Sequence, residues 1–577
     1  MHKYFKNMET LGKDLKEKSR QRNSENADEL QKEEEKIRSA KEETKQFGLP
    51  AEKINSRGQL TVFQRLEILV DEGTWRPLHT LYNPAGNEDC TTNVVDGLAR
   101  INGRWAVVIG FDNKNLAGAW VPGQPENILR ATDLSKRLNI PLVWIVNCSG
   151  VKLPEQEKFY AGRRSSGTTF FRHAELEQMG VPVLAGIYGT NPAGGGYQGI
   201  SPWVLFAHQD CNIAVGGAGI VSGMSPKGYF DTESAQELIE AAKKHQATPP
   251  GTVDIHHDET GFFKFVFEKE EDVLYSMREY MKKLPAYDTE VFRVDEPKAP
   301  AFSAEDLYYL LPMNPKRTYV FEEILARLTD GSEHMEFRPD YGPEVYTGLV
   351  KINGLLFGCI GNRQGVLPKG YPEYADYPGI GGKLYRQGLI KMNEFVSLCG
   401  RDRLPIIWFQ DTSGIDVGNT AEKAELLGLG QSLIYSIQQT DVPMMLVNLR
   451  KGSAAAHYIM GGPTANRHNS FTLGTAATEI YVMHGETAAV ATYTRRLIKD
   501  QQAGNPLEPT VDKMNELVEK YHETSRPMFC AKTGLLDEVA DLGEIRGYLE
   551  AFAEAAYQNP ASICPHHQLI LPRIIKG

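Results

Sequence analysis

Two short runs of small residues, each following an apolar segment, are the parts of this sequence most able to do chemistry. The first run, residues 193–196, contains Gly194, Gly195 and Gly196, and the second, residues 454–456, contains Ala455 and Ala456. Small residues between a strand and a helix let a ligand approach the backbone. The first amides of a helix have no partner within it, so they can stabilise negative charge on an oxygen.

Tight packing of a helix on a sheet also explains small residues, so either run alone would be weak evidence. Here the run occurs twice, and Tyr197 and Tyr458 follow it at matching places. The recurrence favours two sites in which main-chain N–H groups face an oxygen.

A Ser-Gly pair follows a strand-like segment in both halves of the chain. The two motifs are Cys148-Ser149-Gly150-Val151 and Thr412-Ser413-Gly414-Ile415. An ordinary turn explains each motif. Because ligands of open α/β sheets bind at the carboxyl ends of parallel strands, each motif is also a candidate wall of a pocket beside the amide donors.

The elements that position these residues alternate along the chain. Apolar runs at 105–111, 140–147 and 181–188 predict buried strands, and 123–138 predicts a helix between two of them. Strands alternating with helices are typical of βαβ units and an α/β fold.

The sequence repeats itself across a proline-rich, charged stretch at 293–306, which we interpret as a linker. Three blocks return in the same order, about 251 to 264 residues later; GLARINGRWAVVIG (97–110), for example, returns as GLVKINGLLFGCIG (348–361). Such a period is too long for a solenoid. We therefore expect two tandem domains, 60–295 and 296–577, after an N-terminal extension, 1–59.

The extension is almost entirely polar over residues 13–46, and its composition favours helix. A helix on the surface of its own domain is one interpretation, and a partner-binding arm is the other. The N-terminus has no apolar core and does not resemble a signal peptide.

Composition excludes several classes of protein. The 577 residues carry a net charge of −11, which disfavours a broad nucleic-acid-binding face. Seven scattered cysteines without a C-x-x-C pair fit a reducing cytoplasm. No apolar stretch is long enough to span a bilayer, so membrane association would need a partner.

The remaining motifs of the sequence give little support for a different chemistry. The sequence has no P-loop and no G-x-S-x-G elbow, and its His-His pairs lack helical metal-ligand spacing. Arg163, Arg164 and Lys451 are candidates for pairing with an anion or for solvated loops. His457, inside the second small-residue block, is a candidate for ligand contact or for a structural hydrogen bond.

The paired motifs NPAGGGYQGISP (191–202) and RKGSAAAHYIMGG (450–462) resemble those of the carboxyltransferase branch of the crotonase superfamily. The resemblance covers residues 60–577. Segments such as LAGAWVPGQ (116–124) and GIGGKLYRQGL (379–389) are most similar to the decarboxylase members of that family. The resemblance implies two tandem crotonase-like domains (ββα superhelix), the first for an acyl-CoA thioester and the second for biotin.

The family likeness also implies roles for individual residues. The amides of Gly194 and Gly195 would hold the thioester oxygen, and those of Ala455 and Ala456 the ureido oxygen of biotin. On the acyl-CoA side, the residues implied to line the pocket are Ala117, Gly118, Ser149, Gly150, Val151 and Gly196. On the biotin side they are Ser413, Gly414 and His457. No metal is implied in this chain.

The implied reaction transfers the γ-carboxyl group of glutaconyl-CoA to biotin and releases crotonyl-CoA. The biotin would be attached to a separate carrier subunit. A homodimer is implied, together with a membrane-embedded sodium-pump subunit that holds the chain at the inner face of the cell membrane. No nucleic-acid partner is implied.

Three alternatives remain open from the sequence. One is a carboxylase subunit acting on methylcrotonyl-CoA or propionyl-CoA, and another is a non-catalytic scaffold. A crotonase-type hydratase would need paired glutamates near the first site, where Glu155 and Glu157 are the nearest candidates.

Overall fold

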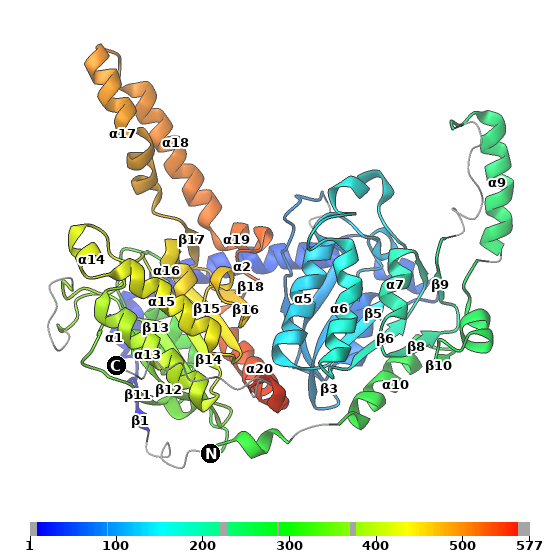
Figure 1. Cartoon of the computed structure of the whole chain (residues 1–577), viewed down its shortest axis with the longest axis horizontal. Coiled ribbons are helices and arrows are strands. Elements are labelled where there is room, and N and C mark those ends of the chain that lie inside the picture. Colours follow the sequence, from blue (N-terminus) through cyan, green and yellow to red (C-terminus); the bar gives the residue numbers. More distant parts are fainter. Residues whose placement is uncertain are drawn as a thin grey trace. The chain divides into compact units, whose positions relative to one another are not determined.

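The protein is described by a computed structural model over residues 8–88, 91–217, 228–247, 249–285, 288–369 and 377–563. The chain divides into two compact units. We call residues 41–286 the N-terminal unit, and residues 1–40 together with 287–577 the C-terminal unit (Figure 1).

The N-terminal unit is built on a seven-stranded sheet with the strand order β10-β8-β6-β5-β4-β3-β2. The strands from β4 to β10 are parallel, and β2 and β3 join them in antiparallel fashion. The strands are β2 (Arg76–Leu78), β3 (Val94–Ile101), β4 (Arg104–Phe111), β5 (Leu142–Val146), β6 (Val183–Ile187), β8 (Val204–His208) and β10 (Phe265–Phe267). A separate parallel pair is formed by β7 (Thr190–Pro192) and β9 (Asn212–Ala214).

Helices cover this sheet on both faces. The helices of this unit are α3 (Ala51–Asn55), α4 (Val62–Leu69), α5 (Gln124–Leu138), α6 (Ser166–Gln178), α7 (Gly194–Ile200), α9 (Thr232–Ala247) and α10 (Glu270–Lys283), of which α9 projects away from the sheet (Figure 1). Val143 and Ile145 of β5 share a core cluster with residues of α4 and α10. Successive strand side chains alternate between faces, so Trp144 points the other way, where its ring lies 5.6 Å from that of His173 on α6.

The C-terminal unit repeats this plan on a nine-stranded sheet with the order β1-β11-β12-β13-β14-β15-β16-β18, where β17 pairs with β15. Its strands are β1 (Glu9–Thr10), β11 (Glu333–Glu336), β12 (Val345–Ile352), β13 (Leu355–Asn362), β14 (Ile406–Thr412), β15 (Met444–Ser453), β16 (Asn469–Gly474), β17 (Glu479–Tyr481) and β18 (Glu538–Val539). Its helices are α1 (Glu17–Arg22), part of α2 (Ser24–Gln46), α11 (Leu307–Leu310), α12 (Phe321–Leu325), α13 (Arg386–Asp402), α14 (Asn419–Lys423), α15 (Leu426–Gln439), α16 (Ala454–Ile459), α17 (Gly485–Ala503), α18 (Glu508–Ser525), α19 (Pro527–Thr533) and α20 (Ile545–Gln558).

The duplication read from the sequence is present in the tertiary structure. Each unit has a hairpin of two eight-residue strands, β3–β4 and β12–β13, in the same register. Both hairpins turn at Asn-Gly, Asn102-Gly103 and Asn353-Gly354, with positive φ at every turn residue. Asn-Gly is the residue pair that such a tight turn prefers.

Side-chain contacts far from the small-residue runs also occur in both units. Asp71 accepts hydrogen bonds from the amides of Asn102 and Gly103 at 3.0 and 2.6 Å, and it pairs with Arg278 at 2.8 Å. Asp330 does the same for Asn353 and Gly354, at 3.0 and 2.6 Å, and pairs with Arg546 at 2.5 Å.

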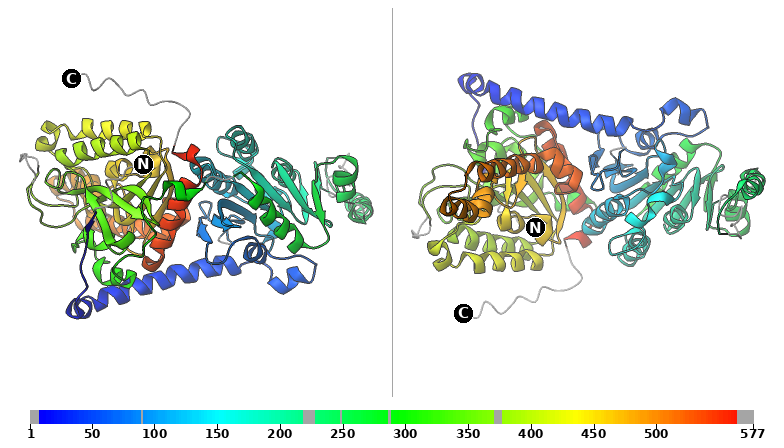
Figure 2. Two further views of the ribbon diagram at one scale, coloured as in Figure 1. Left: turned by 90° about the horizontal axis from the view of Figure 1, so that it is seen from below. Right: turned by 90° about the horizontal axis from the view of Figure 1, so that it is seen from above.

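The polar extension forms the helices α1 and α2, as its composition predicts, and α2 is the long blue helix of Figure 2. It is anchored on the C-terminal unit. Asn26 donates to the carbonyls of Tyr308 and Leu311 at 2.9 Å, and Glu34 accepts from the Leu542 amide at 2.8 Å. At least this part of α2 therefore packs on the protein itself.

The predicted strands correspond to β4, β5 and β6, and the predicted helix at 123–138 corresponds to α5. In the described part of the chain, no helix is both long enough and apolar enough to cross a bilayer. The cysteines at 90 and 564 and the histidine pair at 566–567 lie outside the described residues.

Candidate active site

The first small-residue run lies where β7 passes into α7. Ala193 has a φ of 49° and α7 begins at Gly194. Tyr197 N donates to Ala193 O at 3.0 Å, which closes the first turn of the helix. The amides of Gly194 and Gly195 precede that bond, so the helix itself gives them no acceptor.

The second run has the same geometry where β15 passes into α16. Ala454, 261 residues after Ala193, has a φ of 48°. The residues after it, Ala455 and Ala456, correspond to Gly194 and Gly195. Ala455 is exposed and Ala456 is buried, as Gly195 is in the first unit.

The first run contains glycines for a steric reason. A Cβ on Gly195 would lie 2.5 Å from the carbonyl oxygen of Cys148, and one on Gly196 would lie 3.0 Å from that of Asn191. A Cβ on Gly194 would lie 3.7 Å from the Trp120 ring, which is an ordinary contact. Only Gly194 therefore accepts a side chain without displacing its neighbours.

Each Ser-Gly turn lies beside its run and is held by a preceding loop. Trp120 N donates to Gly150 O at 2.8 Å, and Leu384 N donates to Gly414 O at 3.0 Å. Gly150 and Gly414 both have left-handed φ values, 99° and 129°. The two turns thus have the same backbone construction.

The remaining predicted acyl-side residues belong to that loop. Ala117 and Gly118 have positive φ, and Ser149 N donates to Ala117 O at 3.1 Å. A Cβ on Gly118 would lie 2.0 Å from the carbonyl oxygen of Asn147, so this position requires glycine. Val151 forms an isolated bridge with Trp120. The structure thus brings the predicted residues of the first unit together.

Asn191 links the two motifs of the first unit, and the sequence reasoning missed it. Its Oδ1 accepts from Cys148 N at 2.7 Å, and its Nδ2 donates to Tyr188 O at 2.9 Å. The side chain is fully buried. Its position three residues before Gly194 was the only signal in the sequence.

Asp411 makes the corresponding link in the second unit. Its carboxylate accepts from Lys451 N at 3.2 Å and pairs with Arg450 at 2.7 Å, and both side chains of this ion pair are buried. Arg450 also donates to the carbonyl of Arg317 at 2.8 Å. Arg450 is thus committed to the fold, and Lys451 lies 3.8 Å from the same carboxylate.

Other candidates from the sequence are also committed to structural contacts. Arg164 pairs with Glu126 at 2.8 Å. Glu155 is half-buried, and hydrogen bonds from Lys152 and Lys158 lower its pKa, which is opposite to what a catalytic acid of a hydratase requires. Burial raises the pKa of Cys148 to about 12, so no thiolate is available beside the first run.

His457 is a buried, neutral imidazole. Burial lowers its pKa to about 4, and its Nδ1 lies 2.7 Å from Gln410 Oε1. The contact with Gln410 confirms a structural hydrogen bond without excluding contact with a ligand. Among the described residues, no cluster of His, Cys, Asp or Glu is arranged to hold a metal ion.

Exposed apolar side chains surround both runs at equivalent positions. We call these four pairs the apolar rim, and each member is between 39% and 92% exposed. The pairs are Leu116 with Ile380, Leu153 with Val417, Tyr197 with Tyr458, and Val215 with Val482. Matching apolar exposure around two related sites is the pattern expected of surfaces that an assembly covers.

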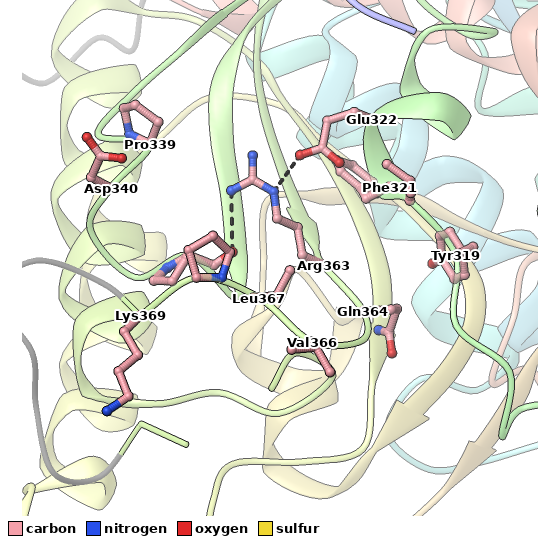
Figure 3. Close-up of a pocket in the computed structure, with 13 residues that line it drawn as sticks. Tyr319, Phe321, Glu322, Pro339, Asp340, Arg363, Gln364, Val366, Leu367 and Lys369 are labelled. Carbon is pink, nitrogen blue, oxygen red and sulfur yellow. Dashed lines mark hydrogen bonds and ion pairs between the residues drawn. The ribbon is translucent and has the colours of Figure 1, made fainter. Parts of the chain in front are cut away.

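A cavity of about 390 Å³ lies next to the second site, in the C-terminal unit (Figure 3). It is lined by Arg363, whose guanidinium binds Glu322 at 2.5 Å and Glu336 at 2.8 Å. Gln364 on its wall donates to the carbonyl of Asp411 at 2.6 Å. Because Arg363 is already paired with two carboxylates, its charge alone does not mark the cavity as an anion site.

Comparison with known proteins agrees with this geometry. Residues 53–570 match the model of the carboxyl transferase domain family. The chain is 58% identical to the glutaconyl-CoA decarboxylase subunit alpha of Acidaminococcus fermentans, over 100% of this chain and 98% of that protein. It is 23% identical to the methylmalonyl-CoA decarboxylase subunit alpha of Propionigenium modestum, over 85% and 89%.

More distant relatives share the fold. The chain is 24% identical to the beta1 subunit of the biotin-dependent 3-methylcrotonyl-coenzyme A carboxylase of Mycobacterium tuberculosis, over 85% of this chain and 87% of that one. The crystal structure of the geranyl-CoA carboxylase β subunit of P. aeruginosa superposes with a TM-score of 0.74 at 20% identity, over 96% and 98% of the two chains. The expected tandem crotonase-like α/β fold is confirmed.

Proposed function

The chain belongs to the carboxyl transferase family, and from this premise we propose that it is the carboxyltransferase subunit of a biotin-dependent, sodium-pumping decarboxylase. It transfers the γ-carboxyl group of glutaconyl-CoA to biotin on a carrier subunit and releases crotonyl-CoA. The observation that carries the proposal is the 58% identity over the whole chain to a glutaconyl-CoA decarboxylase subunit, against 24% to a methylcrotonyl-CoA carboxylase subunit.

The first site stabilises the charge that decarboxylation creates. When the bond between the γ-carbon and the carboxyl group breaks, its electron pair delocalises through the double bond onto the thioester oxygen. The amides of Gly194 and Gly195 are donors of fixed orientation for this oxygen. One such donor lowers a barrier by about 3 kcal/mol.

Six residues of the first unit form the wall around the thioester: Ala117, Gly118, Ser149, Gly150, Val151 and Gly196. Their left-handed turns and tight contacts keep the backbone fixed before the substrate arrives. Because the Cys148 thiol stays protonated, the site acts through hydrogen bonds and not through a covalent thiol adduct.

The second site fits the ureido group of biotin. The exposed Ala455 places an amide at the surface, and a small side chain there leaves room for the ring. Bound biotin supplies the nitrogen that receives the carboxyl group, and the proton which that nitrogen loses balances the proton gained by the γ-carbon. The amides of Ala455 and Ala456 hold the ureido oxygen, and Ser413, Gly414 and His457 line the site.

The two sites must face each other for the carboxyl group to pass between them. The apolar rim supports a homodimer in which the first site of one copy faces the second site of the other, since equivalent exposed side chains then cover each other. Residues 60–295 thus serve the acyl-CoA, and residues 296–577 serve biotin.

The further partners are a biotinyl carrier subunit and a membrane-embedded sodium-pump subunit. The latter holds this chain at the cytoplasmic face of the cell membrane. A net charge of −11 does not favour nucleic acid as a partner.

Carboxyl transfer to free biotin by the purified chain tests the proposal. We expect turnover with glutaconyl-CoA and none with malonyl-CoA or methylmalonyl-CoA. Carboxylation in the reverse direction with methylcrotonyl-CoA or propionyl-CoA would point to a carboxylase subunit. Absence of transfer with every thioester would point to a scaffold.

A further inference from the structure

The imidazole of His457 is fixed in one tautomer. Its Nδ1 lies 2.7 Å from Gln410 Oε1, an oxygen that also accepts from Asn448 Nδ2 at 3.0 Å. Gln410 Nε2 donates to the His457 carbonyl at 3.2 Å, which defines the orientation of the amide. Because the Gln410 oxygen only accepts, Nδ1 carries the proton and Nε2 keeps its lone pair.

The Nε2 atom is an acceptor without a partner. It makes no hydrogen bond to any part of the chain that the structure describes, although the residue as a whole is only 7% exposed. Burial keeps the ring neutral, with a pKa of about 4, so the lone pair persists throughout the physiological pH range.

His457 directly follows Ala455 and Ala456 in α16, whose first turn carries the amides of the second site. Helical side chains lean toward the helix N-terminus, so the ring leans back along this first turn. A Cβ on Gly452, at the end of β15, would lie 2.9 Å from its Nδ1, so the ring packs against the strand end. The second site thus combines N–H donors with an acceptor.

The first site has no such acceptor at the equivalent positions. The residues equivalent to Gln410, Asn448 and His457 are Val146, Ile187 and Gly196, which offer no polar side chain. This difference matches the two ligands. A thioester carbonyl is an oxygen with no N–H next to it, whereas a ureido oxygen is flanked by two N–H groups.

We propose that His457 Nε2 accepts a hydrogen bond from a ureido N–H of biotin while the neighbouring amides hold the ureido oxygen. The proposal rests on the proposed function and deepens it, because it assigns the chemical feature by which the second site selects biotin over a thioester. Gln410 is then a positioning residue, because its contact with Nδ1 keeps the lone pair on Nε2.

Two variants of similar size separate this role from a purely structural one. His457→Asn keeps a polar atom near the position of Nδ1, and so the link to Gln410, but it has no acceptor at the position of Nε2. His457→Gln reaches the position of Nε2 with its carbonyl oxygen and gives up the link. Initial rates of carboxyl transfer with free biotin as the probe give KM for biotin and for glutaconyl-CoA separately.

We expect His457→Asn to raise KM for biotin about tenfold, the effect of one neutral hydrogen bond. His457→Gln should stay within about threefold of wild type, and KM for glutaconyl-CoA should not change in either variant. The reverse order, or equal values for the two variants, would overturn the assignment of His457 while leaving the proposed function intact. Absence of transfer by the wild-type chain would overturn both.

Discussion

Ala193 and Ala454 lie 261 residues apart and have nearly the same left-handed φ, 49° and 48°. Alanine rarely adopts this conformation, which costs an L-residue about 1–2 kcal/mol. Each alanine directly precedes the amides assigned to its oxyanion site. The strained residue turns the chain from strand to helix, so that the next two N–H groups point toward a ligand.

Replacing Ala193 by glycine should relieve this strain. The gain is offset by the greater backbone entropy of glycine in the unfolded chain, so Ala193→Gly should stabilise the protein by up to about 1 kcal/mol. Ala455→Gly, at a helical residue without positive φ, should instead lower stability. Thermal unfolding of both variants measures whether their changes in stability have opposite signs. A loss of stability in both variants would mean that Ala193 is not strained.

Substitutions at Gly194 should separate the amide from the side chain. Gly194→Ala keeps the N–H and makes only an ordinary contact with Trp120, so we expect nearly wild-type kcat. Gly194→Pro removes the N–H at a first helical position that tolerates proline, and kcat should fall about 10²- to 10³-fold. Equal activity of the two variants, with equal melting temperatures, would refute the role of this amide.

Asn191→Ala should damage the first site selectively. The substitution leaves the buried Cys148 amide without an acceptor, which lowers the stability of the protein by about 1–3 kcal/mol. It also removes a hydrogen bond that fixes the Ser-Gly turn. We expect a higher KM for the acyl-CoA and an unchanged KM for free biotin. Asn127→Ala is the control, because Asn127 is also buried and bonded, to Asp96 at 2.8 Å, but lies outside the site.

Glu34 should make stability depend on pH. Burial raises its pKa from 4.5 to about 7 while it accepts from Leu542 N and Tyr308 Oη. The folded chain therefore binds this proton more tightly than the unfolded chain. The stability that Glu34 contributes is fully present below pH 4.5 and is lost as the pH rises through 7.

Glu34→Gln removes this titration. The variant should be more stable than wild type at pH 8, by an amount on the order of 1 kcal/mol, and no more stable at pH 5. Melting temperatures across this range are the measurement. A constant difference at all pH values would mean that Glu34 does not titrate there.

A charge in the apolar rim should dissociate the proposed homodimer. Leu153→Asp and Val417→Asp each place a carboxylate where an apolar partner surface is expected, and we expect monomers in analytical ultracentrifugation with loss of carboxyl transfer. Tyr275→Asp on α10 is the control, because Tyr275 is equally apolar and 55% exposed but lies outside the rim. A dimer that survives both rim variants would exclude this interface.

The sequence by itself determined the duplication, the βαβ organisation and the two small-residue runs. These follow from local patterns, because a repeat, an apolar run or a glycine cluster is visible without knowledge of the fold. Asn102-Gly103 and Asn353-Gly354 likewise specify their turns from two residues each. Family likeness supplied the proposed substrate and the proposed role of each run.

Only the tertiary structure decided which polar residues support the site. Asn191 on β7 meets the Cys148 amide just after β5, and Gln410 on β14 meets His457 on α16, and the spacing of these residues in the sequence carries no periodic signal. Arg164, a candidate from the sequence for pairing with an anion, is instead committed to Glu126, and Arg450 is committed to Asp411. Burial and long-range hydrogen bonds set the charge state and the available atoms of such groups, and these depend on residues distant in the sequence.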